Sequence, residues 1–121
     1  MKNIKVEALL NGMAANPAWE IKDNDARKVM NIYTSLTAGS FVNRTKDYSR
    51  FYNGCMVEVS SCKKIHVFDG CAIINENNVI EVRVDKNKKL EKRLLKHLKT
   101  APMIKNLIFG LSFDEDISKA V

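Results

Sequence analysis

Residues 54–99 constrain the fold more than any other stretch, because strand-like runs there pass directly into one helical pattern. In two of the runs apolar residues alternate with mostly polar ones, which is the period of a strand with one buried and one solvated face. The apolar positions are Cys55, Val57 and Val59 in the first run, and Ile80, Val82 and Val84 in the second. We expect these positions to form the buried face of a sheet.

Two further runs, 64–68 and 71–75, lie between these strands. They are separated by Asp69–Gly70, a pair that readily takes the positive φ angles of a tight hairpin turn. Asn77–Asn78 is a second such turn signal. The runs therefore predict an antiparallel meander, with four strands if Asp69–Gly70 is a turn and three if it is a bulge.

Residues 86–99 follow the meander and have the pattern of an amphipathic helix. Leucines at 90, 94, 95 and 98 recur at intervals of three and four, which gathers them on one side of a helix. Asp85 or Asn87 can accept a hydrogen bond from the unpaired amides of the first turn, and Pro102 cannot continue the helix. We expect this helix to cover the apolar face of the meander with its leucines.

The rest of the chain supplies further elements around the same core. A helix is predicted from about Asp23 to Leu36, with one apolar stripe of Ala26, Val29, Met30, Tyr33 and Leu36. Trp19 is expected to be buried, because a lone tryptophan contributes a large apolar area to a core. Residues 4–13 suit a short amphipathic helix or a brief strand. Residues 102–111 suit either a helix that begins at Pro102 or a loop followed by a strand.

Together these patterns predict an α+β fold. The predicted architecture is a single domain over residues 1–121, in which an antiparallel β-meander of three to four strands packs against two or three amphipathic helices. The length of 121 residues suits one domain.

Composition places the chain among globular proteins, since 45% of its residues are hydrophobic and 28% are charged. No apolar run approaches the roughly 20 residues that span a bilayer, so no membrane partner is expected. Three cysteines without framework spacing fit a reducing compartment and predict a cytoplasmic location. Many Asn, Lys and Ile residues suggest an AT-rich coding source, and small basic chains of this kind are frequent among phage and mobile-element products.

The positive charge is concentrated in residues 86–99. This segment has seven Lys or Arg residues and one Glu, an excess of six that equals the net charge of +6 of the whole chain. Lysines in the first turn oppose the helix dipole, so helix stability alone would not select this pattern. The cluster can attract phosphates or an acidic protein surface. The alternative is a solvated face that aids solubility. The candidate binding residues here are Lys88, Lys89, Lys92, Arg93 and Lys96.

The loop at 44–52 is a second candidate binding region. Its basic residues Arg44, Lys46 and Arg50 are interleaved with Tyr48, Phe51 and Tyr52. Cations can neutralise phosphates while aromatic faces stack on unpaired bases, as single-stranded nucleic acid requires. Tyr48 is the best stacking candidate. The alternative is an ordinary loop whose aromatic residues plug the edge of the core and whose arginines pair with nearby carboxylates.

Catalytic and metal-binding patterns are weak. Cys55, Cys62, His66 and Cys71 are separated by seven, four and five positions, which lacks the close paired spacing of a zinc site, so no metal or cofactor is expected. Another set could act as general acid and base if it shares the solvated sheet face, although charged cross-strand pairs are the commoner use of such residues. This set is Glu58, His66, Glu81 and Arg83. No catalytic residue is assigned.

We therefore expect a small non-enzymatic nucleic-acid-binding accessory protein that uses the basic helix at 86–99 and the basic and aromatic loop at 44–52. The alternative is a protein-protein interaction module, such as an inhibitor, adaptor or assembly component, whose basic helix or sheet edge binds an acidic protein partner. Uncovered sheet edges would also allow two copies to pair as a homodimer.

Overall fold

The computed structural model describes residues 3–12, 15–39 and 51–112. Within these ranges the chain forms one seven-stranded antiparallel sheet with the order β2-β1-β4-β5-β6-β7-β3. Three α-helices and one 3₁₀ turn complete the α+β fold. The predicted class is confirmed, but the sheet has more strands than the expected three to four. The strands are β1 (Ile4–Leu10), β2 (Ala18–Ile21), β3 (Thr37–Ala38), β4 (Tyr52–Ser60), β5 (Lys63–Phe68), β6 (Cys71–Glu76) and β7 (Val79–Val84).

Strands β4 to β7 are the predicted meander in its four-stranded form. Asp69 and Gly70 have φ angles of 51° and 86°, and Asn77 and Asn78 have φ angles of 53° and 66°. Two successive positive φ angles are what a two-residue hairpin turn requires, and Asn, Asp and Gly tolerate them best. Asp69–Gly70 is therefore a turn and not a bulge.

The three additional strands extend the meander at both edges. β1 pairs with β4, and β2 pairs with β1, so the amino-terminal hairpin forms one edge of the sheet. Residues 4–10 are a strand because the apolar residues at alternate positions are all buried, as in the pair Ile4 and Val6. Trp19 is buried in β2, as predicted. At the other edge, β3 is only two residues long and pairs with the end of β7.

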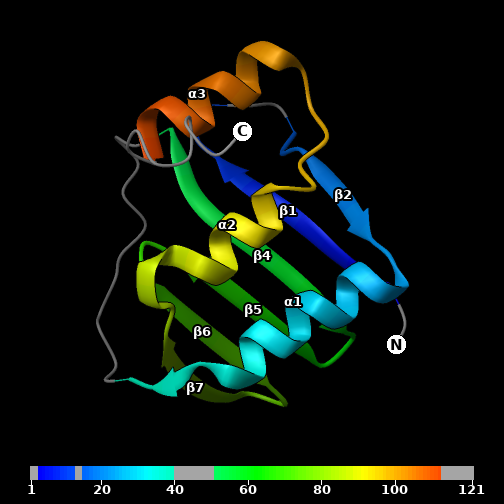
Figure 1. Cartoon of the computed structure of the whole chain (residues 1–121), viewed down its shortest axis with the longest axis vertical. Coiled ribbons are helices and arrows are strands. Elements are labelled where there is room, and N and C mark those ends of the chain that lie inside the picture. The colour runs from blue at the N-terminus through cyan, green and yellow to red at the C-terminus, as the bar shows by residue number, and fades with distance from the viewer. Residues whose placement is uncertain (1–2, 13–14, 40–50, 113–121) are drawn as a thin grey trace.

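Two helices lie side by side over one face of the sheet (Figure 1). They are α1 (Asp23–Ser35) and α2 (Lys89–Leu95). Both predicted apolar stripes pack against the core, and all their residues are buried except Leu36, which is partly buried. The buried helix residues are Ala26, Val29, Met30 and Tyr33, followed by Leu90, Leu94, Leu95 and Leu98. The third helix, α3 (Pro102–Ser112), contacts β4 and settles the open alternative for residues 102–111 in favour of a helix.

The basic helix is shorter than the predicted 86–99. Residues Lys86–Lys88 form the 3₁₀ turn η1, and the α-helix proper begins at Lys89. Asn87 and Lys88 have φ angles of 58° and 55°, a left-handed conformation that a right-handed helix cannot include. After Leu95 the α-helical pattern ends, and backbone hydrogen bonds join residues three apart instead of four, such as the one from the His97 N–H to the Leu94 carbonyl.

The predicted buried face of β7 is wrong. Ile80 is 56% exposed and Val84 is 42% exposed, and both lie on the sheet face that the helices do not cover. The Asn77–Asn78 turn sets a register that pairs Ile74 with Glu81. Paired residues in an antiparallel ladder share a face, and Ile74 is buried under the helices. Ile80, Val82 and Val84 therefore point to the other side, which we call the open face.

Candidate functional site

We call residues 86–99 the basic segment. Its start is held by Asp85, whose buried carboxylate accepts hydrogen bonds from the backbone N–H groups of Leu90 at 2.8 Å and Glu91 at 3.0 Å. The Asp85 N–H donates to the carbonyl of Gly70 at 2.8 Å. Burial raises the pKa of Asp85, while the two helix amides and Lys92 oppose that rise. Asp85, one of the two predicted caps, thus joins the start of α2 to the β5–β6 turn.

Glu91 is the single acid of the basic segment, and it points into the core. Its side chain is 1% exposed. The Tyr52 hydroxyl donates to its Oε2 at 2.6 Å, and the Asp69 N–H donates to its Oε1 at 2.9 Å. Burial raises the pKa of Glu91 to about 7, against the opposing effect of these two hydrogen bonds and of Lys88. The segment therefore presents no carboxylate of its own to solvent.

Tyr52 and Cys55 complete this buried cluster. The Tyr52 hydroxyl lies 3.5 Å from the Cys55 Sγ. Burial raises the pKa of Tyr52 well above its usual value and raises the pKa of Cys55 to about 12. The thiol stays protonated and is no nucleophile at neutral pH. Tyr52 is a core residue, as the packing alternative predicted for this end of the 44–52 loop. The predicted binding residues Arg44, Lys46, Tyr48 and Arg50 lie outside the described residues.

The solvent side of the basic segment is cationic. Lys86, Lys89, Lys96 and Lys99 are exposed, and Lys92 and Arg93 are half-buried. Lys88 forms an ion pair with Asp69, with 3.5 Å between Nζ and Oδ1. Burial lowers the pKa of His97, so this ring adds no positive charge at neutral pH. The structure thus brings the five predicted cations of the segment together on α2 and on the turns directly before and after it.

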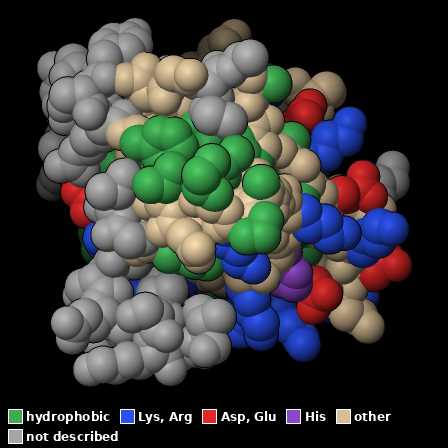
Figure 2. Space-filling model, turned by 90° about the horizontal axis from the view of Figure 1, so that it is seen from above, with side chains coloured by type: hydrophobic (Ala, Val, Ile, Leu, Met, Phe, Trp, Pro, Cys, Tyr) green, Lys and Arg blue, Asp and Glu red, His purple; other side chains and the backbone are tan. Residues whose placement is uncertain are grey.

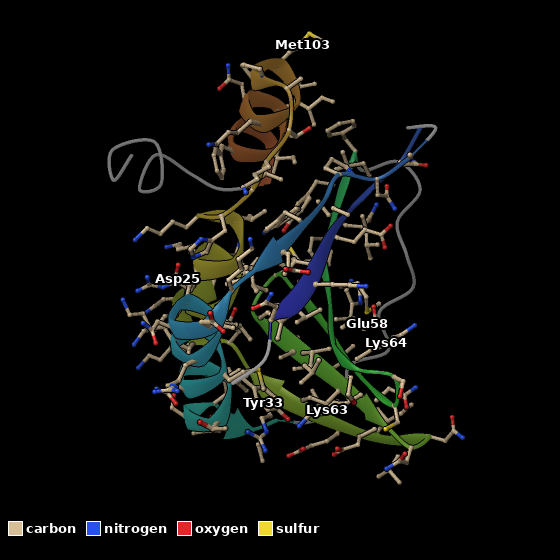
Figure 3. All side chains as sticks on the ribbon, turned by 90° about the vertical axis from the view of Figure 1, so that its right-hand side faces the viewer. Asp25, Tyr33, Glu58, Lys63, Lys64 and Met103 are labelled. Carbon is tan, nitrogen blue, oxygen red and sulfur yellow. The ribbon has the colours of Figure 1, made fainter. Side chains whose placement is uncertain are left out.

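The neighbouring helix α1 adds charges of both signs. Arg27 and Lys28 are exposed on it, and so are Asp23 and Asp25 in its first turn. Two further cations of the same sheet face pack on a ring: Lys63 Nζ lies 4.9 Å and Arg83 Cζ lies 4.6 Å from the centroid of Tyr33 (Figure 3 shows Lys63 beside Tyr33). The excess of cations therefore belongs to the basic segment.

The four residues considered for acid–base chemistry are not assembled. The register pairs Glu81 with Ile74 and Arg83 with Ala72, which places both on the helix-covered face. Glu58 and His66 pair with Lys64 and Met56 on the open face. Arg83 instead donates to Glu81 at 3.0 Å and to the carbonyl of Tyr33 at 3.1 Å. The condition for acid–base chemistry, that all four residues share one sheet face, is therefore not met.

Metal binding has no support among residues 3–12, 15–39 and 51–112, where no three His, Cys, Asp or Glu side chains gather closely enough to hold an ion. The structure places the cysteines of the weak zinc pattern in different surroundings. Cys55 is buried beneath the helices, whereas Cys62 is exposed in the β4–β5 turn.

The described part of the chain has no exposed aromatic ring. Trp19, Tyr33 and Tyr52 are buried. Phe51, Phe68 and Phe109 are partly buried against the core. The described surface can therefore neutralise phosphates, but it offers no ring on which a base could stack.

No known family matches the chain, and no curated protein or solved structure matches it either. Among the described residues, no helix has both the length and the apolar character needed to span a bilayer.

Proposed function

We propose that the protein binds the phosphate backbone of nucleic acid through the basic segment. The observation that supports this function best is the inward orientation of Glu91, which leaves no acid of the segment on its solvent side. A helix that merely needed solubility would benefit equally from an exposed acid. A phosphate backbone would be repelled by one.

The described residues suit backbone contacts better than base contacts. Lysines neutralise phosphates without reading sequence, and no exposed ring accompanies them in the described ranges. We therefore expect weak sequence preference from the basic segment. A preference for single strands would have to come from Tyr48 and the basic residues of the 44–52 loop, which remain a prediction.

The test is fluorescence anisotropy with single-stranded DNA, duplex DNA and RNA of equal length at several salt concentrations. The variant Lys89→Gln/Lys96→Gln removes two exposed cations of the segment. Loss of two phosphate contacts should weaken duplex binding and lower its log–log salt slope by roughly 2. The matched control is Lys5→Gln/Lys64→Gln, which removes two exposed cations from the open face.

The control should retain the affinity and salt slope of the unaltered protein. The proposal is wrong if all three nucleic acids bind weakly with little dependence on salt. It is also wrong if the control pair weakens binding as much as the basic-segment pair, since binding would then follow net charge alone.

A protein partner is the second candidate, because α3 exposes apolar side chains that a phosphate backbone would not use. Met103 is 72% exposed and Leu107 is 42% exposed. They are four residues apart and so lie on one side of the helix. Met103 points away from the rest of the molecule (Figure 3), and an apolar patch at this end of the molecule adjoins Lys and Arg side chains (Figure 2). An acidic amphipathic helix would match both features.

Met103→Gln/Leu107→Gln separates the two candidates. Nucleic-acid binding should stay unchanged in this variant, since no cation is lost. A synthetic helical peptide with Glu on one side and Leu on the other should bind the unaltered protein and lose affinity for the variant if α3 docks a protein. Equal peptide affinity for both proteins would reduce the interaction to charge and eliminate the second candidate.

A further inference from the structure

The open face contains a hollow of about 540 Å³ that the proposed function does not use. It lies at the end of the sheet where the β4–β5 and β6–β7 turns come together. Its volume falls within the roughly 300–1,000 Å³ of small-molecule sites. The helices lie on the other face of the sheet (Figure 1), so the hollow is separate from the basic segment.

Two neighbouring rows of the sheet form the floor. Met56, His66 and Ile73 stand opposite one another on β4, β5 and β6, and Lys64, Asn75 and Ile80 do so on β5, β6 and β7. Strands lie about 4.8 Å apart, so four strands span roughly 14 Å. Met56, Ile73 and the exposed Ile80 make this floor largely apolar. The hollow therefore suits an elongated apolar group that crosses the strands.

The rim is polar and fixed. The Asn77 N–H donates to the Cys62 carbonyl at 3.0 Å, which joins the two turns into one wall. His66 Nε2 lies 2.9 Å from the carbonyl of Asn53. A carbonyl can only accept, so Nε2 donates and this bond holds the ring in place. The surface is therefore formed before a ligand binds, so binding would not cost free energy to order these turns.

Lys64 gives the hollow its charge. It is the one Lys, Arg, Asp or Glu among the described residues that line the hollow. Glu58, its partner in the register, does not belong to the lining, although both side chains project from the open face (Figure 3). An anionic group above the floor would pair with the Lys64 ammonium and could accept from the neighbouring Asn75 amide. A purely apolar ligand would desolvate Lys64 without compensation.

We propose that this hollow binds an amphipathic carboxylate, with an alkyl chain along Met56, Ile73 and Ile80 and the carboxylate at Lys64. The chain would gain from burial of apolar surface that the fold leaves exposed. The carboxylate would retain polar partners in the Lys64 ammonium and the Asn75 amide.

The test uses decanoate as the probe, with decanol and decylamine as its neutral and cationic counterparts. Binding is followed by two-dimensional NMR of the full chain, which also reports that each variant is folded. Decanoate should shift the resonances of Ile73, Asn75 and Ile80 and should bind more tightly than either counterpart. Lys64→Gln should weaken decanoate binding about fivefold, as expected for the loss of one partly exposed ion pair, and should leave decanol binding unchanged.

Lys5→Gln is the matched control, because Lys5 is an exposed cation on the same face outside the hollow. It should bind decanoate as the unaltered protein does. The Lys89→Gln/Lys96→Gln variant should also bind it normally, which separates this proposal from the proposed function. The proposal fails if decanoate shifts none of these resonances, if decylamine binds equally well, or if Lys5→Gln weakens binding as much as Lys64→Gln.

Discussion

The two faces of the sheet use apolar residues in different ways. On the helix-covered face, Ile65, Val67 and Ile74 are buried beneath α1 and α2. On the open face, residues of β4 to β7 remain partly in water, and Ile80 is 56% exposed. Burial on the covered face supplies the free energy of folding, so those side chains have little freedom to serve another purpose. Residues of the open face contribute less to folding and can therefore be selected for binding.

The polar groups of the two faces also differ in role: those of the covered face hold the fold together, and those of the open face remain available to a ligand. Asp85 and Glu91 lie under the helix layer, and each carboxylate accepts two hydrogen bonds. These bonds fix the register of α2 on the sheet and turn its one acid inward. On the open face, Lys64 and Asn75 stand at a hollow with an apolar floor. The basic segment and the hollow lie on opposite sides of the sheet, so their ligands would not compete for space.

Truncation of a leucine of α2 that packs on the covered face should cause the largest loss of stability. Leu94→Ala removes buried methyl groups and leaves a cavity between α2 and the sheet, which should lower the free energy of unfolding by roughly 3 to 5 kcal/mol. Ile80→Ala on the open face should lower it by less than about 1 kcal/mol, because much of that side chain is already in water. Urea denaturation followed by circular dichroism measures both values.

Equal losses of stability in the two variants would contradict this difference between the faces. A large loss for Ile80→Ala would mean that the open face is covered in solution, and that its apolar residues belong to a core. An unchanged dependence of the unfolding free energy on urea would confirm that neither variant alters the surface exposed on unfolding.

Sequence patterns predicted those parts of the fold whose structure is determined by residues close together in the sequence. The turns at Asp69–Gly70 and Asn77–Asn78 and the leucine stripe at 90–98 are of this kind, and all three predictions are confirmed. β2 and β3 were not predicted, and a brief strand was one of two alternatives for residues 4–13. The pairings that make these segments part of the sheet join residues distant in the sequence. β3 has only two residues, and its partner β7 lies more than forty positions away. No local pattern records such a pairing.

The directions in which the side chains of β7 and Glu91 point could not be predicted from the sequence in the same way. Alternation in β7 was recognised, but the side that would be buried depends on where the helices lie and on the register that Asn77–Asn78 imposes. The charge count identified the basic segment, but it did not show that the side chain of Glu91 points into the core. The leucines at 90, 94 and 95 could have indicated otherwise, since position 91 lies beside that stripe on a helical turn.

The buried acid of the covered face should make stability depend on pH. Glu91 has a pKa of about 7 in the folded protein, against 4.5 for the ordinary side chain. Its protonated form is therefore favoured by folding. The contribution of this protonation to the free energy of unfolding amounts to at most about 3 kcal/mol. It is fully present below pH 4.5 and is lost as pH rises through 7. Glu91→Gln cannot lose a proton, so the variant should match the unaltered protein near pH 4 and exceed it in unfolding free energy near pH 8.

Urea denaturation of the two proteins from pH 4 to pH 8 isolates this effect, because Asp85 and every other carboxylate are common to both and cancel in the difference. Glu58→Gln, on the open face, controls for the removal of one negative charge near the sheet. A difference between Glu91→Gln and the unaltered protein that stays constant with pH would show that Glu91 does not gain its proton on folding. The hydrogen bonds from Tyr52 and Asp69 would then hold an ionised carboxylate at all these pH values, and the covered face would contain a buried charge.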